Sequence, residues 1–178
     1  MKKFILGILS FLIVGCGYAP IGRISDNILE DKIFVDVFMN KIDPQNTVAI
    51  KDAVKDGIIY RLHKELSDKK NANNFIIASI NHLSFSPLTY DQYGYATSYR
   101  VNLVLAFEAR LKDGRVVRFS GSGDHDFRVT RLLKNARDTS SIISDQERYE
   151  AIKNASTQAF DEFIAVLGIE SLKSSEFK

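Results

Sequence analysis

Between residues 99 and 129 the chain alternates apolar and polar side chains, interrupted only around Asp113-Gly114 and at Gly121 and Gly123. A period of two is typical of strands that bury one face. Asp-Gly suits a type I′ turn, whose two central residues need positive φ. The segment therefore predicts an antiparallel hairpin, with the two glycines marking a bulge or a close contact. The positions expected on the buried face are Tyr99, Val101, Leu103, Leu105 and Phe107, then Val117, Phe119, His125, Phe127 and Val129.

Two further strands are predicted upstream of this hairpin. Ile33, Val35 and Val37 alternate with their neighbours and indicate a strand. Residues 75–86 are apolar enough for a central strand, and residues 87–94 have the Pro, Asp and Gly content of a turn or short loop.

Two helices complete the pattern. Apolar side chains recur at three and four over residues 45–68, which predicts an amphipathic helix. Ser144 and Glu147 form a capping box at the start of a helix that we expect to run to Leu167, with Gly168 as its C′ residue. The predicted order is β-α-β-β-β-α. It indicates a two-layer α+β fold with two helices packed on one face of a four-stranded, mainly antiparallel sheet. The other face is left open.

The first sixteen residues resemble a bacterial lipoprotein signal. Lys2 and Lys3 precede 11 mainly apolar residues, which as a helix would span about 16 Å and are too short to cross a membrane. Cys16, the only cysteine, follows Gly15 as in a lipobox. We predict a signal peptide at 1–15, a lipidated N-terminus and linker at 16–31, one domain at 32–168 and a flexible tail at 169–178. The alternative is a buried cysteine in a cytosolic core helix.

Lipid on Cys16 would anchor the protein to a membrane, because two or three acyl chains hold far more firmly than one. Residue 17 is Gly rather than the Asp that resembles an inner-membrane retention signal, so the outer membrane, on its periplasmic side, is favoured. Without residues 1–15, the chain has 22 basic and 22 acidic residues, because Lys2 and Lys3 account for two of its 24 Lys and Arg. This balance argues against nucleic acid as a partner.

Several segments resemble the LptE family of lipopolysaccharide-assembly lipoproteins. They are Cys16-Gly17-Tyr18, the stretch from Ala96 to Leu103, the Asp113-Gly114 turn, and the capping box with its helix. The resemblance also covers the order of elements over nearly the whole mature chain. It implies a protein that sits in the lumen of the outer-membrane β-barrel LptD as its plug, assists assembly of that barrel, and helps deliver lipopolysaccharide to the outer leaflet. It implies neither covalent chemistry nor a cofactor.

Basic residues gather in one segment of this otherwise neutral chain. Between residues 110 and 137 there are eight Lys and Arg and only three Asp. Because lipopolysaccharide carries phosphates, basic side chains are the groups expected to bind it. The candidate patch is Arg118, Arg128, Arg131, Lys134 and Arg137. The alternative is an ordinary solvated strand edge, where basic residues deter pairing with other strands.

Tyr90, Tyr93 and Tyr95 fall in the loop between the second and third predicted strands. Tyrosine is common at interfaces, because it combines apolar area with a polar tip. We therefore predict that these residues contact the barrel wall. A packed hairpin tip is the alternative.

Enzyme chemistry finds no support in the sequence. The three histidines lack HExxH spacing, and the Asp124-His125-Asp126 triplet on a strand directs the His away from both Asp side chains, which argues against a metal site. No GxSxG, Walker or dinucleotide-binding motif is present. Besides the plug, an auxiliary lipoprotein of a lipid-transport complex stays open. A lipoprotein hydrolase would need a nucleophile cluster that this chain does not supply.

Overall fold

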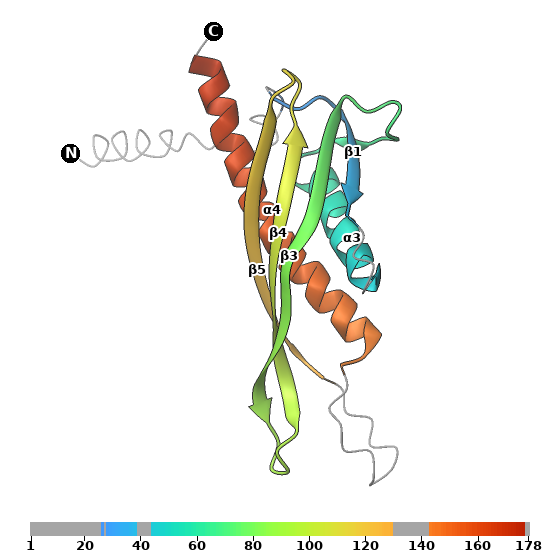
Figure 1. Cartoon of the computed structure of the whole chain (residues 1–178), viewed down its shortest axis with the longest axis vertical. Coiled ribbons are helices and arrows are strands. Elements are labelled where there is room, and N and C mark those ends of the chain that lie inside the picture. Colours follow the sequence, from blue (N-terminus) through green and yellow to red (C-terminus); the bar gives the residue numbers. More distant parts are fainter. Residues whose placement is uncertain (1–25, 27, 39–43, 130–142, 177–178) are drawn as a thin grey trace, which may run out of the picture.

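The structure, a computed structural model, describes residues 26, 28–38, 44–129 and 143–176 (Figure 1). No helix in these ranges is long and apolar enough to cross a membrane. The elements in chain order are β1 (Lys32–Val37), α3 (Pro44–Tyr60), β2 (Glu65–Leu66), β3 (Asn74–Tyr90), β4 (Ala96–Arg110), β5 (Val116–Arg128) and α4 (Asp145–Glu176).

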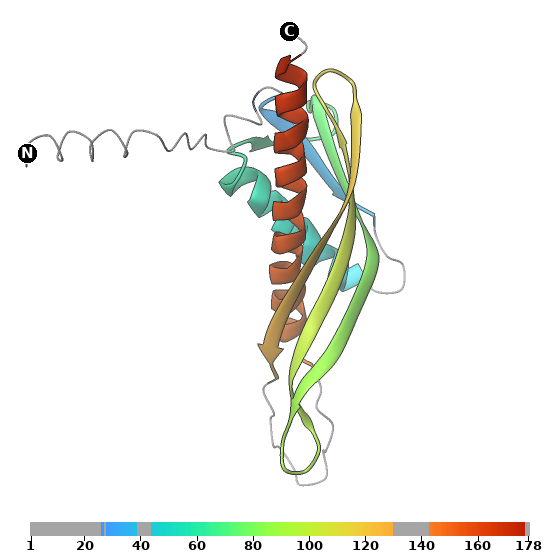
Figure 2. The same cartoon turned by 90° about the vertical axis from the view of Figure 1, so that its left-hand side faces the viewer.

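The strands form one sheet in the order β2-β1-β3-β4-β5. β3, β4 and β5 are antiparallel, whereas β1 runs parallel to both β2 and β3. Both helices lie on the same side of the sheet (Figure 2), so the predicted two-layer α+β class is confirmed. The sheet is mixed and has five strands rather than the predicted four.

The fifth strand arises because α3 is shorter than its apolar periodicity suggests. The helix ends at Tyr60 rather than near residue 68. His63 then adopts a positive φ of 55°, which redirects the chain. Leu66 pairs with Ile33, so backbone pairing with β1 replaces the last turns of the predicted helix.

The core lies between the helices and the face of the sheet predicted from the alternation. On β4, Val101, Leu103, Leu105 and Phe107 are all buried. Phe107 stacks on Phe163 of α4, with ring centroids 4.8 Å apart and an interplanar angle of 18°. Burying one such ring stabilises the fold by roughly 1.5–3 kcal/mol.

α4 is anchored against β5 at the two glycines of that strand. A Cβ added at Gly121 would collide with the backbone oxygen of Ala159, and one at Gly123 with that of Ala155. The prediction of a close contact at these glycines is confirmed. Absence of both side chains lets the helix backbone approach the strand directly.

The two ends of α4 differ in how well they were predicted. The capping box is confirmed, because the Glu147 N–H donates to Ser144 Oγ at 3.3 Å and the Ser144 N–H donates to the Glu147 carboxylate at 3.0 Å. The predicted C-terminus is wrong. The helix continues through Gly168 to Glu176, and Arg115 reaches Glu170 at 3.4 Å in the segment expected to be a tail.

β3 is also longer than predicted. It passes through Pro87 to Tyr90 and leaves only a short turn before β4. Pro87 lies opposite Tyr99, at a position where its nitrogen faces away from β4, so no bond of that ladder is lost. The long hairpin of β3 and β4 therefore projects to one end of the molecule, opposite the C-terminal end of α4 (Figure 1).

Candidate functional site

The tip of this hairpin presents two of the three predicted tyrosines. Tyr93 is 72% exposed and Tyr90 60%, whereas Tyr95 is half-buried. The turn is held by Asp91, whose Oδ1 accepts hydrogen bonds from the backbone N–H groups of Tyr93 at 2.9 Å and Tyr95 at 3.0 Å. The tip is thus a fixed turn that carries exposed aromatic rings. Contact of these rings with a barrel stays a prediction.

The basic residues of β5 do not form one patch. Arg118 and Arg128 lie on the open face of the sheet, as expected, and both are exposed. Ten residues of strand separate them by about 33 Å, so the two side chains cannot bind one phosphate group together. Arg118 also donates to Glu108 at 2.8 Å. Arg131, Lys134 and Arg137 lie outside the described residues, so their part in a patch stays a prediction.

An ion-pair cluster that the sequence analysis missed lies between these two arginines. Arg100 of β4 faces Asp126 of β5 and binds it through two hydrogen bonds, of 2.5 and 2.7 Å. The hydrogen bond from Arg100 is the main cause that holds the pKa of Asp126 below its ordinary value. Asp124 lies 3.8 Å from Arg100. The middle of the open face is therefore polar but largely charge-compensated.

The triplet Asp124-His125-Asp126 is oriented as the strand geometry predicts. His125 turns toward α4, where its Nε2 lies 3.3 Å from the amide nitrogen of Asn154. The two Asp side chains are on the exposed face. Within the described ranges, no group of three or more His, Cys, Asp or Glu side chains is placed to hold a metal ion.

An apolar groove crosses the open face nearer to β1. Its volume is about 550 Å³, and Phe38, Ile77 and Ala106 contribute apolar surface while Glu108 and Arg118 contribute charge. Phe38 is 70% exposed. The sequence analysis did not single out Phe38, although its position out of phase with Ile33, Val35 and Val37 places it on the open face. Arg118 is thus placed beside apolar surface rather than within a basic cluster.

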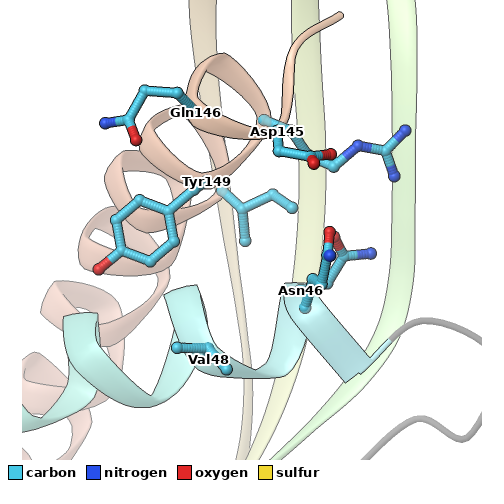
Figure 3. Close-up of a pocket in the computed structure, with 8 residues that line it drawn as sticks. Asn46, Val48, Asp145, Gln146 and Tyr149 are labelled. Carbon is cyan, nitrogen blue, oxygen red and sulfur yellow. The ribbon is translucent and has the colours of Figure 1, made fainter.

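A second pocket of about 310 Å³ lies between the first turns of α3 and α4 (Figure 3). Asn46 and Val48 line it from α3, and Tyr149 from α4. The Tyr149 hydroxyl donates to Asp52 Oδ2 at 2.9 Å, and this hydrogen bond is the main cause that raises the pKa of Tyr149. Because this contact joins the two helices, we interpret the pocket as part of the interface between them.

The segment just before β1, which was predicted to be part of a linker, packs against the domain. Ile28 and Leu29 are buried, and the Lys112 N–H donates to the Ile28 carbonyl at 3.0 Å. Lys64, with a side chain only 4% exposed, binds Asp26 at 2.6 Å and Asp31 at 2.9 Å. The packed part of the chain therefore begins before residue 32. Cys16 lies outside the described residues, and its lipidation stays a prediction.

Comparisons with known proteins give a family match and several similar solved structures. The family model described as LptE, lipopolysaccharide-assembly, matches residues 32–167. Among solved structures, rare lipoprotein B from Shewanella oneidensis is 15% identical, with a TM-score of 0.42, 82% of this chain covered and 96% of that chain. A putative lipoprotein from Caulobacter crescentus is 12% identical, with a TM-score of 0.47 and coverages of 88% and 98%. A minor lipoprotein from Acinetobacter baumannii is 11% identical, with a TM-score of 0.43 and coverages of 76% and 93%. Curated proteins give no match.

Proposed function

Because this chain belongs to the LptE family of lipopolysaccharide-assembly proteins, we propose that it is the plug and assembly partner of the outer-membrane β-barrel LptD and aids lipopolysaccharide delivery to the outer leaflet. The observation that carries the proposal is the family match over residues 32–167, which spans every strand and most of α4. The chain is accordingly a lipopolysaccharide-assembly lipoprotein of the cell envelope. The barrel, the outer membrane and the plug role are the proposed refinements.

The shape of the molecule supports a plug. A plug has to present a wide surface to the wall of the barrel lumen, and both helices in the described part of the chain lie on one face of the sheet, which leaves the other face uncovered by them (Figure 2). At the centre of that face Arg100 is paired with Asp126 and lies 3.8 Å from Asp124, so covering this cluster leaves each carboxylate beside a guanidinium. The tyrosines at the tip, Tyr90 and Tyr93, would pack against the barrel wall, and Tyr95 would support the turn.

Lipopolysaccharide contacts are proposed at two separate places. Arg118 stands at the rim of the apolar groove, where a phosphate could meet the guanidinium while an apolar chain covers Phe38. Arg128 would act with Arg131, Lys134 and Arg137, which follow it in the chain. The proposed work is transient binding and needs neither covalent chemistry nor a cofactor.

The anchor is proposed to be lipid on Cys16. From Cys16 to Asp26 the chain makes ten Cα–Cα steps, which span at most about 35 Å when fully extended. This segment joins the domain beside Lys112, at the end of the sheet away from the tyrosine tip. The tip would therefore point away from the site of attachment.

Purification of the full-length, lipidated protein in mild detergent tests this function. We expect a large outer-membrane barrel to co-purify in stoichiometric amount and to be identified by mass spectrometry. Inner-membrane transporter subunits in its place would refute the plug and favour an auxiliary lipoprotein of a lipid-transport complex. A Tyr93 photocrosslinker that never reaches the barrel in an intact complex would refute the proposed tip contact alone.

A further inference from the structure

β3 changes from a central strand to an edge strand part-way along its length. β1 pairs with Asn74 to Ala78, and the Phe38 N–H donates to the Ala78 carbonyl at 2.9 Å. Beyond Ala78, within the part of the chain that the structure describes, β3 pairs only with β4. Its outer edge from Ser79 to Tyr90 has no neighbouring strand there, and Figure 1 shows it running past the end of β1.

The direction of each backbone group on this edge follows from the ladder. The Ser122 and Asp124 N–H groups point away from β4, because they donate to side chains of α4. Hydrogen-bond direction alternates along an antiparallel strand, so their partners, Val104 and Asn102, direct their backbone groups toward β3.

His82 lies opposite Val104 and Ser84 lies opposite Asn102, so the backbone groups of His82 and Ser84 form the hydrogen bonds between β3 and β4. The residues that lie out of phase with them, Leu83 and Phe85, therefore direct their N–H and C=O groups outward. Pro87, two residues further on, directs only a carbonyl outward. The free edge thus offers donors and acceptors at intervals of about 6.6 Å, the two-residue repeat of a strand.

No residue of β3 itself protects this edge by charge, and the nearby charge comes from α4, where the Arg148 guanidinium lies 5.1 Å from the centre of the Phe85 ring. The whole of β3, from Asn74 to Tyr90, contains no Asp, Glu, Lys or Arg, although 26% of the chain is charged. Edge strands of soluble proteins are usually blunted by charged side chains, especially Lys. The opposite edge, β5, is covered, because Glu162 and Gln158 accept from the Ser122 and Asp124 N–H groups at 2.8 and 3.0 Å.

We propose that the free edge of β3 around Leu83 and Phe85 is a docking site for an extended segment of a partner protein, which adds a strand to the sheet. An extended backbone is the ligand whose donors and acceptors repeat at the interval of this edge. Half-buried Leu83 offers apolar contact to the added strand on the helix side, and the Phe85 ring does so beside the Arg148 guanidinium that lies over it. Ser84 leaves room on the other side of the sheet. The inference deepens the proposed function by assigning a surface and a binding mode to the partner, yet it does not depend on the partner being a barrel.

Backbone hydrogen exchange of the full-length protein, free and in its purified complex, tests the docking site. In the free protein, the amides of Leu83 and Phe85 should exchange faster than those of His82 and Ser84. In the complex they should slow by at least about tenfold, because each gains a hydrogen bond. Overlapping peptides across residues 79–90, followed by mass spectrometry, provide the required resolution.

A matched pair of variants separates the backbone group from the side chain. Leu83→Pro removes an outward N–H without breaking a bond to β4, and its ring occupies the space of an incoming carbonyl. Leu83→Ala removes more of the side chain but keeps that N–H. We expect Leu83→Pro to reduce the co-purified partner by about tenfold and Leu83→Ala by less than about twofold.

The outcomes distinguish this inference from the proposed function. A co-purified barrel with unprotected Leu83 and Phe85 amides overturns the docking edge and leaves the plug standing. Protected amides in a complex with a different protein support the edge and overturn the barrel. Protection in a dimer of this chain alone, or no protection in a chain that purifies alone, overturns the docking proposal. Hydrogen exchange of the unmodified protein tests the docking proposal even if the Leu83→Pro variant fails to fold.

Discussion

Replacement of Gly123 by alanine measures how closely α4 is pressed against β5. The added Cβ would collide with the backbone oxygen of Ala155, so the helix or the strand has to move. Overpacking of this kind costs typically about 1–3 kcal/mol. Movement also stretches the two hydrogen bonds that the Ser122 and Asp124 N–H groups of β5 donate to Glu162 and Gln158, each contributing about 1 kcal/mol. We expect a net loss of about 3 kcal/mol in the free energy of unfolding, or roughly 10 °C in Tm for a domain of this size.

Urea unfolding of the purified protein, followed by circular dichroism, provides the assay. Gly94→Ala is the control, because Gly94 has a φ of 82° but no atom lies within 4 Å of a Cβ added there, and it should lose only about 1 kcal/mol. Ala155→Gly should not rescue Gly123→Ala, because the collision is with a backbone oxygen. A Gly123→Ala protein within about 0.5 kcal/mol of the parent would refute the close approach.

Three further predictions concern the segment before β1, the interface between the helices and the anchor. The hydrogen bond and ion pair with Lys64 lower the pKa of Asp31, so their stabilising effect should be present above pH 3.8 and lost as the pH falls through the lower pKa of the folded state. Proteolysis of the segment before β1 should therefore accelerate in acid. A Lys64→Met variant should show less of this pH dependence. Tyr149→Phe removes the hydrogen bond to Asp52 and should lower the free energy of unfolding in urea by about 1 kcal/mol, whereas an unchanged value would mean that the bond is replaced by water. Cys16→Ser should abolish incorporation of radiolabelled palmitate into the protein; a variant that still takes up the label would argue against a lipid anchor at that position.

The candidate site was predictable where it depends on one strand alone. Exposure of Arg118 and Arg128 on a common face follows from alternation, which is a local property of the chain. The ion pair of Arg100 with Asp126 was missed, because the predicted type I′ turn, with Asp113 and Gly114 at its centre, would set Arg100 opposite Phe127. The observed loop has three residues between Leu111 and Arg115, and only Gly114 of them has a positive φ, which shifts the register by one residue. The exposed Phe38 was not singled out, although its position out of phase with Ile33, Val35 and Val37 places it on the open face.

The fold shows the same division. The positions of β4, β5 and the start of α4 were already determined by the sequence, because alternation, an Asp-Gly turn and a capping box act over a few residues. Tertiary structure decided the rest. Leu66 left the predicted helix because β1 offered backbone hydrogen bonds, and Gly168 stayed helical in a segment held by the contact of Arg115 with Glu170. Pro87 stayed in β3 because its nitrogen faces the free edge. In each case a partner distant in sequence determined the outcome, and propensity, a preference of about 1 kcal/mol per residue, was too weak to oppose it.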